Sequence, residues 1–430
     1  MNTRDGFLSI SPLVLFVLLY LVIAIITGDF YYVPMSVVFS VAVVYGFFIS
    51  YHISFTERIK SFGKGVFSPQ VGIIIGIFIL AGAFSECAKE MGCFNDTVNF
   101  ALDLLPSKYI YAGIFIASCI ISMATGSAIS TVITLVPISA GLAHSLGINV
   151  SLITAIVVGG SFFGDNLSFI SDTTIMATNT QGCKMSDKFK VNFKIVLPAA
   201  IILTIIYLIM GNDLVVNETH HDINFLNIIP YAIVIILALL GVNVLLVLSL
   251  GLIAAIGIGL SQGCFDLAGC AWAIIIGIKG MLDVIMLTLF SSGLIGIIRK
   301  NGGLDFVMER ISQHVHSKCM AQMNIALMTV ICTICTAMNT IAIITVGSLA
   351  KDMSKKYYLD SRKVASILDI FSCSTQGLLP YGAHLLAGAS IAGVTVFSLF
   401  PFLLYPLMIA ALGVLSIIFD FPKLKPQKNK

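Results

Sequence analysis

The sequence predicts an all-α polytopic membrane protein made of two inverted-topology repeats, with broken or re-entrant helices and roughly 12–14 membrane segments. Three observations support this: an apolar composition, recurring apolar spans, and polar breaks that recur in the same order. Of the 430 residues, 58% are hydrophobic and 10% are charged, and the mean hydropathy is +1.02. Soluble domains carry about 25% charged residues. This chain therefore has too little polar surface for a water-soluble fold of its size.

The apolar spans are long enough to cross a hydrocarbon layer of about 30 Å, which takes roughly 20 residues of helix. Two shorter segments, 168–180 and 384–398, follow longer spans and are expected to be half-helices or re-entrant segments. The longer spans are expected at 7–27, 30–50, 68–87, 108–124, 128–146, 149–163, 190–210, 226–241, 243–261, 281–298, 319–337, 341–350, 364–378 and 400–420.

Basic residues are distributed unevenly over the connections between these spans. If the N-terminus is cytoplasmic, all 24 lysines and arginines fall on the cytoplasmic side except Lys89, Lys108 and Lys279. This bias matches the positive-inside rule and predicts that both termini are cytoplasmic. The formal net charge of +3 then reflects orientation in the membrane and gives no reason to expect a nucleic-acid partner.

An internal repeat is indicated by three pairs of similar segments, which occur in the same order and at a nearly constant separation along the chain. Residues 1–210 form the first predicted repeat, 211–225 an extracytoplasmic linker, and 226–430 a second repeat with a basic cytoplasmic tail. Seven spans per repeat is an odd number, so the halves are expected to have opposite orientations, as in many secondary transporters. The paired segments are 82–92 with 293–303, 122–131 with 336–345, and 159–174 with 373–384.

Residues 159–174, GGSFFGDNLSFISDTT, place two carboxylates and several hydroxyls after an apolar run. The helix is expected to unwind near 164–170, with Ser171 or Asp172 capping a half-helix that begins at Thr173. Carboxylate and hydroxyl oxygens suit an alkali cation, and a carboxylate held away from water also binds a proton more tightly. We therefore predict a Na⁺/H⁺ site that includes Asp165, Asp172, Ser168 and Thr173. Structural roles, a membrane-boundary acid for Asp165 and a helix cap for Asp172, are the alternative.

The remaining breaks are expected to face this site near the middle of the membrane, because broken helices are tolerated only where they line protein or a polar cavity. Asp369 could bind a cation or proton or make a bond between helices, and His384 could titrate near neutral pH or be a solvated loop residue. The supporting breaks contain Thr125, Gly126, Ser127, Asn339, Thr340, Gln376, Gly377 and Pro380.

The segment from Gly164 to Thr174 resembles the G-D-x-x-S-P-x-S-D-T-T signature of the NhaC family of Na⁺/H⁺ antiporters. Ala124-Thr125-Gly126-Ser127 is similar to the family's A-T-G-[ST] break, and Gln376 to Gly382 resembles a late element. The resemblance implies a two-repeat antiporter of the bacterial inner membrane whose ion path includes Asp165 and Asp172. Phe169 stands in place of the signature's proline. Asn166 occupies a position that is often basic, so a positive charge beside Asp165 is expected to be missing.

Three candidate functions differ in the residues that they require. Na⁺/H⁺ exchange by alternating access is favoured, with no cofactor besides the transported ions. Coupled exchange of an organic acid such as malate or lactate, or of an amino acid, is the alternative, and it would need a cation or exposed helix N-termini inside the bundle. No arginine lies in the core of a predicted span. An intramembrane aspartyl protease would need a G-x-G-D motif, and Phe162 breaks it. Membrane lipid is an expected partner, and a homodimer is left open.

Overall fold

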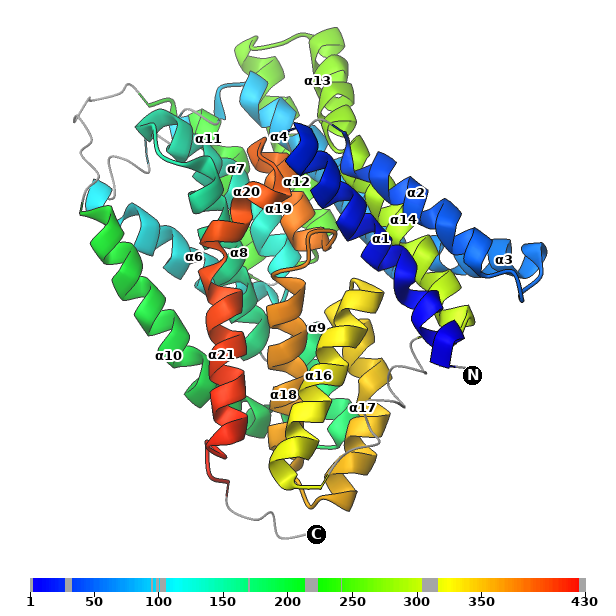
Figure 1. The fold of residues 1–430 in the computed structure, drawn as a ribbon. Coiled ribbons are helices and arrows are strands. Elements are labelled where there is room, and N and C mark those ends of the chain that lie inside the picture. Colours follow the sequence, from blue (N-terminus) through cyan, green and yellow to red (C-terminus); the bar gives the residue numbers. More distant parts are fainter. Residues whose placement is uncertain are drawn as a thin grey trace.

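The computed structural model describes residues 3–27, 33–93, 96–97, 100, 106–168, 171–212, 223–240, 242–303 and 316–424. Within these residues all regular secondary structure is helical, which confirms the predicted fold class (Figure 1). Seven described stretches are long and apolar enough to cross a membrane, or eight if the pair 383–392 and 396–402, bent by 97°, forms one span. Further apolar helices are shorter, so the total of 12–14 segments stays a prediction.

The described helices fall into two halves of the chain, before and after residue 212. The first half contains α1 (Thr3–Thr27), α2 (Met35–Ile49), α3 (Phe55–Val66), α4 (Pro69–Glu90), α6 (Ile110–Thr125), α7 (Ala128–Leu146), α8 (Val150–Leu167), α9 (Asp172–Gln181) and α10 (Met185–Gly211). The second contains α11 (Phe225–Leu239), α12 (Val244–Gln262), α13 (Leu267–Gly280), α14 (Leu282–Lys300), α16 (Lys318–Thr336), α17 (Asn339–Lys356), α18 (Ser361–Gln376), α19 (Ala383–Ala392), α20 (Val396–Leu399) and α21 (Leu404–Ile418).

Two of these helices, α3 and α13, lie where the sequence predicted connections. Helix α3 is amphipathic and begins after Ser54, whose side chain accepts a hydrogen bond from the backbone N–H of Glu57. Helix α13 is apolar but has only 14 residues, which is too short for a search based on membrane-spanning length. Helix α3 is amphipathic and is not among the apolar helices, so it does not change the number of spans in the first half. The inversion of the halves stays a prediction that rests on an odd number of spans and on the charge distribution.

Several helices of each half pack against helices of the other half. Helix α4 packs against α13, and α3 packs against α14; likewise α7 packs against α19, and α17 packs against α9 (Figure 1). The α4–α13 crossing is so close that a Cβ atom at Gly82 would collide with the carbonyl of Gly277, and one at Gly277 with that of Gly82. Small residues at such crossings let helix backbones approach in a membrane. Each half thus covers apolar surface of the other.

Two helix breaks, one in each half, have nearly the same backbone conformation. Helix α6 ends at Gly126 with φ +64°, and α16 ends at Ala337 with φ +53°. The residues that follow, Ser127 and Met338, have φ of −143° and −142°. Glycine enters the left-handed region without steric cost, whereas alanine does so only at a cost. The correspondence is the one expected of a repeat.

Several predicted features lie outside the described residues. Phe169, most of the linker 211–225 and the end of the basic tail belong to this group.

Candidate functional site

The predicted break after α8 is present, but its details differ from the prediction. Helix α8 continues to Leu167, and α9 begins at Asp172, with Ser171 rather than Asp172 at the N-cap position. Gly164 lies within the continuous part of α8, where a Cβ atom would collide with Ser122 of α6. This glycine therefore permits close packing of α8 on α6 and does not cause the unwinding. Ser168, just after α8, donates a hydrogen bond from Oγ to the carbonyl oxygen of Met123 at 2.9 Å.

Asp165 lies in the last turn of α8 and is only 5% exposed. Its Oδ1 accepts one hydrogen bond from the backbone N–H of Ala128, the first residue of α7, and another from Oγ of Ser171, both at 3.2 Å. Ser171 Oγ in turn lies 3.0 Å from Oγ1 of Thr173. No described residue bonds Oδ2 of Asp165. One oxygen of this buried carboxylate is therefore bonded to the break, while the other has no partner among the described residues.

A cavity of about 230 Å³ brings the predicted site residues of both halves together. Its apolar wall comes from Ile73, Ile74 and Ile77 of α4 and from Val244 of α12. The predicted residues that line it are Gly126, Ser127, Asp165, Asp172 and Thr173 from the first half, and Asn339, Thr340, Gln376 and His384 from the second. Asp172 is exposed, and no described residue forms a hydrogen bond or ion pair with its carboxylate.

The other predicted residues do not line this cavity. Thr125 and Ser168 belong to the breaks but are not among its lining residues. Thr125 Oγ1 accepts a hydrogen bond from the backbone N–H of Ser127 at 3.2 Å. Gly377 packs where a Cβ atom would collide with Pro406, and Pro380 lies in the turn between α18 and α19. These residues shape the breaks without facing the cavity.

Asp369 belongs to a separate buried network beside the site. Its Oδ2 lies 2.8 Å from Nζ of Lys188 and accepts hydrogen bonds from Asn166 Nδ2 (3.0 Å) and Asn192 Nδ2 (2.7 Å). Lys188 Nζ and Asn192 Nδ2 also donate to the carbonyl oxygen of Asn166, at 3.0 and 2.9 Å. Carbonyls at a helix end have no partner within the helix. Lys188 and Asn192 each donate a hydrogen bond to one such carbonyl, that of Asn166.

This network corrects two expectations from the sequence. The threading of the spans puts Lys188 in a cytoplasmic connection, but it is fully buried in α10, so the bundle does contain a cation. A positive charge also lies beside Asn166, contributed by α10 rather than by position 166 itself. The residue spacing could have indicated that Lys188 is buried, because Lys188 and Asn192 share a helical face with Ile195 and Ala199. All four residues are buried.

His384 and Gln376 form the part of the cavity wall that belongs to the second half. His384 is buried against Phe162, with ring centroids 4.8 Å apart, so the solvated-loop interpretation is wrong. Its Nδ1 has no hydrogen-bond partner among the residues that the structure describes. Gln376 donates from Nε2 to the carbonyl oxygen of Ala337 at 3.0 Å, while its Oε1 has no partner in the described part of the chain.

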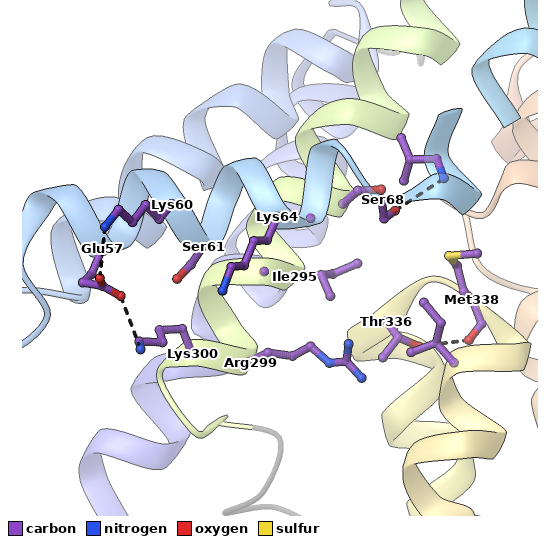
Figure 2. A pocket seen from close by; sticks show the side chains of 15 residues that line it. Glu57, Lys60, Ser61, Lys64, Ser68, Ile295, Arg299, Lys300, Thr336 and Met338 are labelled. Carbon is purple, nitrogen blue, oxygen red and sulfur yellow. Dashed lines mark hydrogen bonds and ion pairs between the residues drawn. The ribbon is translucent and has the colours of Figure 1, made fainter. Parts of the chain in front are cut away.

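A second, larger cavity of about 570 Å³ was not predicted (Figure 2). It lies between α3, α14 and the α16–α17 break, and its basic lining residues are Lys60, Lys64, Arg299 and Lys300. Met338 lines this cavity and the smaller one, so the two are neighbours.

Paired helix breaks around a cavity with a buried carboxylate are typical of secondary transporters. The chain belongs to the Na⁺/H⁺ antiporter family, whose model matches residues 7–212 and 217–419. The family resemblance seen in the sequence is thereby confirmed.

Named relatives are distant but cover most of the chain. It is 23% identical to the malate-2H⁺/Na⁺-lactate antiporter of Bacillus subtilis, over 82% of this chain and 79% of that protein. It is 22% identical to the Na⁺/H⁺ antiporter NhaC of Alkalihalophilus pseudofirmus, over 77% and 76%. It is also 22% identical to the arginine/ornithine antiporter ArcD of Halobacterium salinarum, over 81% of each.

Proposed function

We propose that this protein exchanges Na⁺ for H⁺ across the bacterial inner membrane by alternating access, with Asp165 binding either ion. The observation that carries the proposal is the position of Asp165 at the cavity between the halves. One carboxylate oxygen is fixed by Ala128 and Ser171, and the other is left for a ligand. The hydroxyl of Thr173 and the carboxylate of Asp172 add hard oxygen ligands on the same wall.

The chemistry of exchange follows from competition for one charge. A carboxylate away from bulk water is costly unless it is neutralised. Either a proton or a sodium ion can do this, but both cannot do so at once. If the loaded site, but not the empty one, can change the side to which it opens, Na⁺ moves one way only when H⁺ moves the other. The transported ions are substrates, and the proposal involves no catalysed reaction.

The topology belongs to the same proposal. Residues 1–210 and 226–430 would be inverted repeats joined by an extracytoplasmic linker at 211–225, with both termini cytoplasmic. The bias of lysine and arginine supports this orientation. The similar backbone conformation at the breaks after α6 and α16 supports the repeat.

Transport in proteoliposomes with an imposed pH gradient tests the proposal. The wild type should take up radioactive sodium and dissipate the gradient, and Asp165→Asn should do neither while remaining folded. Asp352→Asn is the matched control, because Asp352 is exposed in α17 and makes no described contact with the cavity. Undiminished exchange in Asp165→Asn would remove Asp165 from the mechanism.

Coupled movement of an organic solute is a second candidate. It is supported by Gln376 Oε1 and His384 Nδ1 in the cavity wall, which have no hydrogen-bond partners among the described residues. The name of the Bacillus subtilis relative also supports it.

A further inference from the structure

We propose that the larger cavity, between α3 and α14, binds the phosphate group of an anionic phospholipid. Basic side chains from both helices surround the phosphate, and the acyl chains stay in the adjoining bilayer. The inference goes beyond the proposed function, because this lipid stays bound and is not transported. It holds whichever ions the protein exchanges.

The described lining of this cavity carries more positive than negative charge. Its basic residues are Lys60, Lys64, Arg299 and Lys300, and its acidic residue is Glu57 (Figure 2). The two carboxylate oxygens of Glu57 lie 3.8 Å from Nζ of Lys60 and 3.4 Å from Nζ of Lys300. Four cations against one carboxylate leave an excess of three positive charges. A cleft lined by one sign of charge concentrates ligands of the opposite sign.

Three lining groups are free to bind an anion. Among the described residues, Lys64 has no hydrogen-bond or ion-pair partner. Arg299 donates from Nη2 to the neutral hydroxyl of Thr345 at 3.1 Å, and its guanidinium has further N–H donors for a phosphate oxygen. Ser61 is only 8% exposed, and its hydroxyl makes no hydrogen bond with a described residue. Figure 2 shows the Ser61 hydroxyl and the Lys64 ammonium on the same side of α3.

A close crossing of α3 and α14 holds these groups in position. A Cβ atom at Gly65 would collide with the carbonyl oxygen of Ser292, and one at Gly296 would collide with that of Ser61. The two backbones are therefore in contact at two points along the crossing. This contact fixes the lysines of α3 relative to the basic end of α14, and a site that is already formed loses less entropy when a ligand binds.

Helix α3 has the character of a helix that lies at a membrane surface. Lys60 and Lys64 are on the side that lines the cavity. Phe55 and Ile59 are on the opposite side of a helix with 3.6 residues per turn, and they are 64% and 50% exposed. Helices with basic residues on one face and large apolar residues on the other bind at the boundary of headgroups and acyl chains. In Figure 1, α3 lies at the edge of the bundle, where lipid can reach it.

The charge of the membrane favours the same ligand. In the proposed orientation, the basic end of α14 lies on the cytoplasmic side. Anionic lipids give the cytoplasmic leaflet a negative surface potential, and basic pockets between membrane helices on that side bind their headgroups. The apolar face of α3 then contacts acyl chains, while its lysines lie at the level of the phosphates.

The first test measures retention of radiolabelled phosphatidylglycerol by the immobilised full-length protein in a neutral detergent, at fixed ionic strength. The competitors are unlabelled phosphatidylglycerol and phosphatidylcholine with the same acyl chains. Both lipids have a phosphate, but the choline group of phosphatidylcholine neutralises it. We expect saturable binding, with phosphatidylcholine competing at least about fivefold more weakly. Equal competition by the two lipids would overturn the site.

The second test removes the two cations that have no carboxylate partner among the described residues. Lys64→Gln and Arg299→Gln should each weaken phosphatidylglycerol binding about fivefold, which corresponds to about 1 kcal/mol for one cation near an anionic lipid. Lys190→Gln is the matched control, because Lys190 is an exposed lysine that does not line the cavity. An equal loss in Lys190→Gln, or no loss in the variant with both substitutions, would contradict the proposal.

The third test changes the charge in the other direction. The Glu57 side chain is 44% exposed, so Glu57→Gln is expected to fold. This variant frees Lys60 and Lys300 and should bind phosphatidylglycerol more tightly, again about fivefold. A change that only loosened α3 would weaken binding, so an increase separates charge from structure. Unchanged or weaker binding in Glu57→Gln would count against the site.

Competition by inorganic phosphate separates a lipid from a soluble anion. At constant ionic strength, inorganic phosphate should displace little labelled lipid when its concentration equals that of the lipid, because it has no acyl chains to contact the apolar face of α3. Complete displacement by inorganic phosphate at that concentration would assign the site to a soluble anion, and the lipid would then be the wrong ligand.

Discussion

Replacing Lys188 by methionine should strongly destabilise the protein. Lys188 is fully buried, and its Nζ contacts Oδ2 of Asp369 (2.8 Å), the carbonyl oxygen of Asn166 (3.0 Å) and Oγ1 of Thr174 (2.7 Å). Methionine keeps most of the packing volume but leaves the charge of Asp369 without its cation. Removing one partner of a buried ion pair costs about 3–5 kcal/mol, and we expect a loss in this range.

The measurement is the free energy of unfolding of the purified protein in detergent. Lys190→Met is the matched control, because the Lys190 side chain is exposed and lies 4.0 Å from Asp187 in a surface pair, where about 0.5 kcal/mol is expected. A second variant, Lys188→Met with Asp369→Leu, should recover much of the loss, since replacing both partners of a buried pair is often nearly neutral. A loss below about 1 kcal/mol for Lys188→Met alone would refute the reasoning.

Three further predictions concern single positions. Ala337→Gly should raise the free energy of unfolding by up to about 1 kcal/mol, because φ of +53° is unfavourable for alanine; a lower melting temperature would contradict this. Although burial alone would raise the pKa of Asp360, hydrogen bonds from Arg362 hold it below its usual range. The stability that this adds is present above the unfolded-state pKa of about 3.9 and is lost at lower pH. Asp360→Asn should therefore be less stable than the wild type at pH 7, with a difference that shrinks below about pH 4 in acid titrations. In single-cysteine variants, an impermeant maleimide added to intact cells should label the exposed Cys264 but not the exposed Cys319; the reverse pattern would overturn the proposed orientation.

The sequence could predict the breaks because they depend on local residue types. Gly126 and the polar residues after Gly164 interrupt apolar runs, so the sequence indicates where the helices break. Inverted symmetry then led to the expectation that Asp165 and Gln376 lie near one another, and both line one cavity. Length-based reasoning failed for α13, because its 14 residues fall short of the roughly 20 that a membrane span needs.

The buried network could not be predicted in the same way, because a lysine near the end of an apolar helix usually marks the membrane surface. Whether such a lysine is exposed or buried depends on which acid faces it. For Lys188 that acid is Asp369, which belongs to the other half of the chain, so hydropathy could not reveal the pair. Only the buried face shared by Lys188 and Asn192 hinted at it.

Helix α3 packs on α14 and α4 packs on α13, so each pair joins the two halves of the chain. This packing has a consequence for biosynthesis. When the ribosome has completed α4 at Glu90, the helix that will cover its Gly82 surface has not yet been made, since α13 begins only at Leu267. At typical rates of chain elongation, that interval is on the order of 10–40 s. During this time the Gly82 surface of α4 lacks the helix backbone against which it packs in the complete protein. Completion of the second half, rather than insertion of the first, is then the step that commits the chain to its native structure.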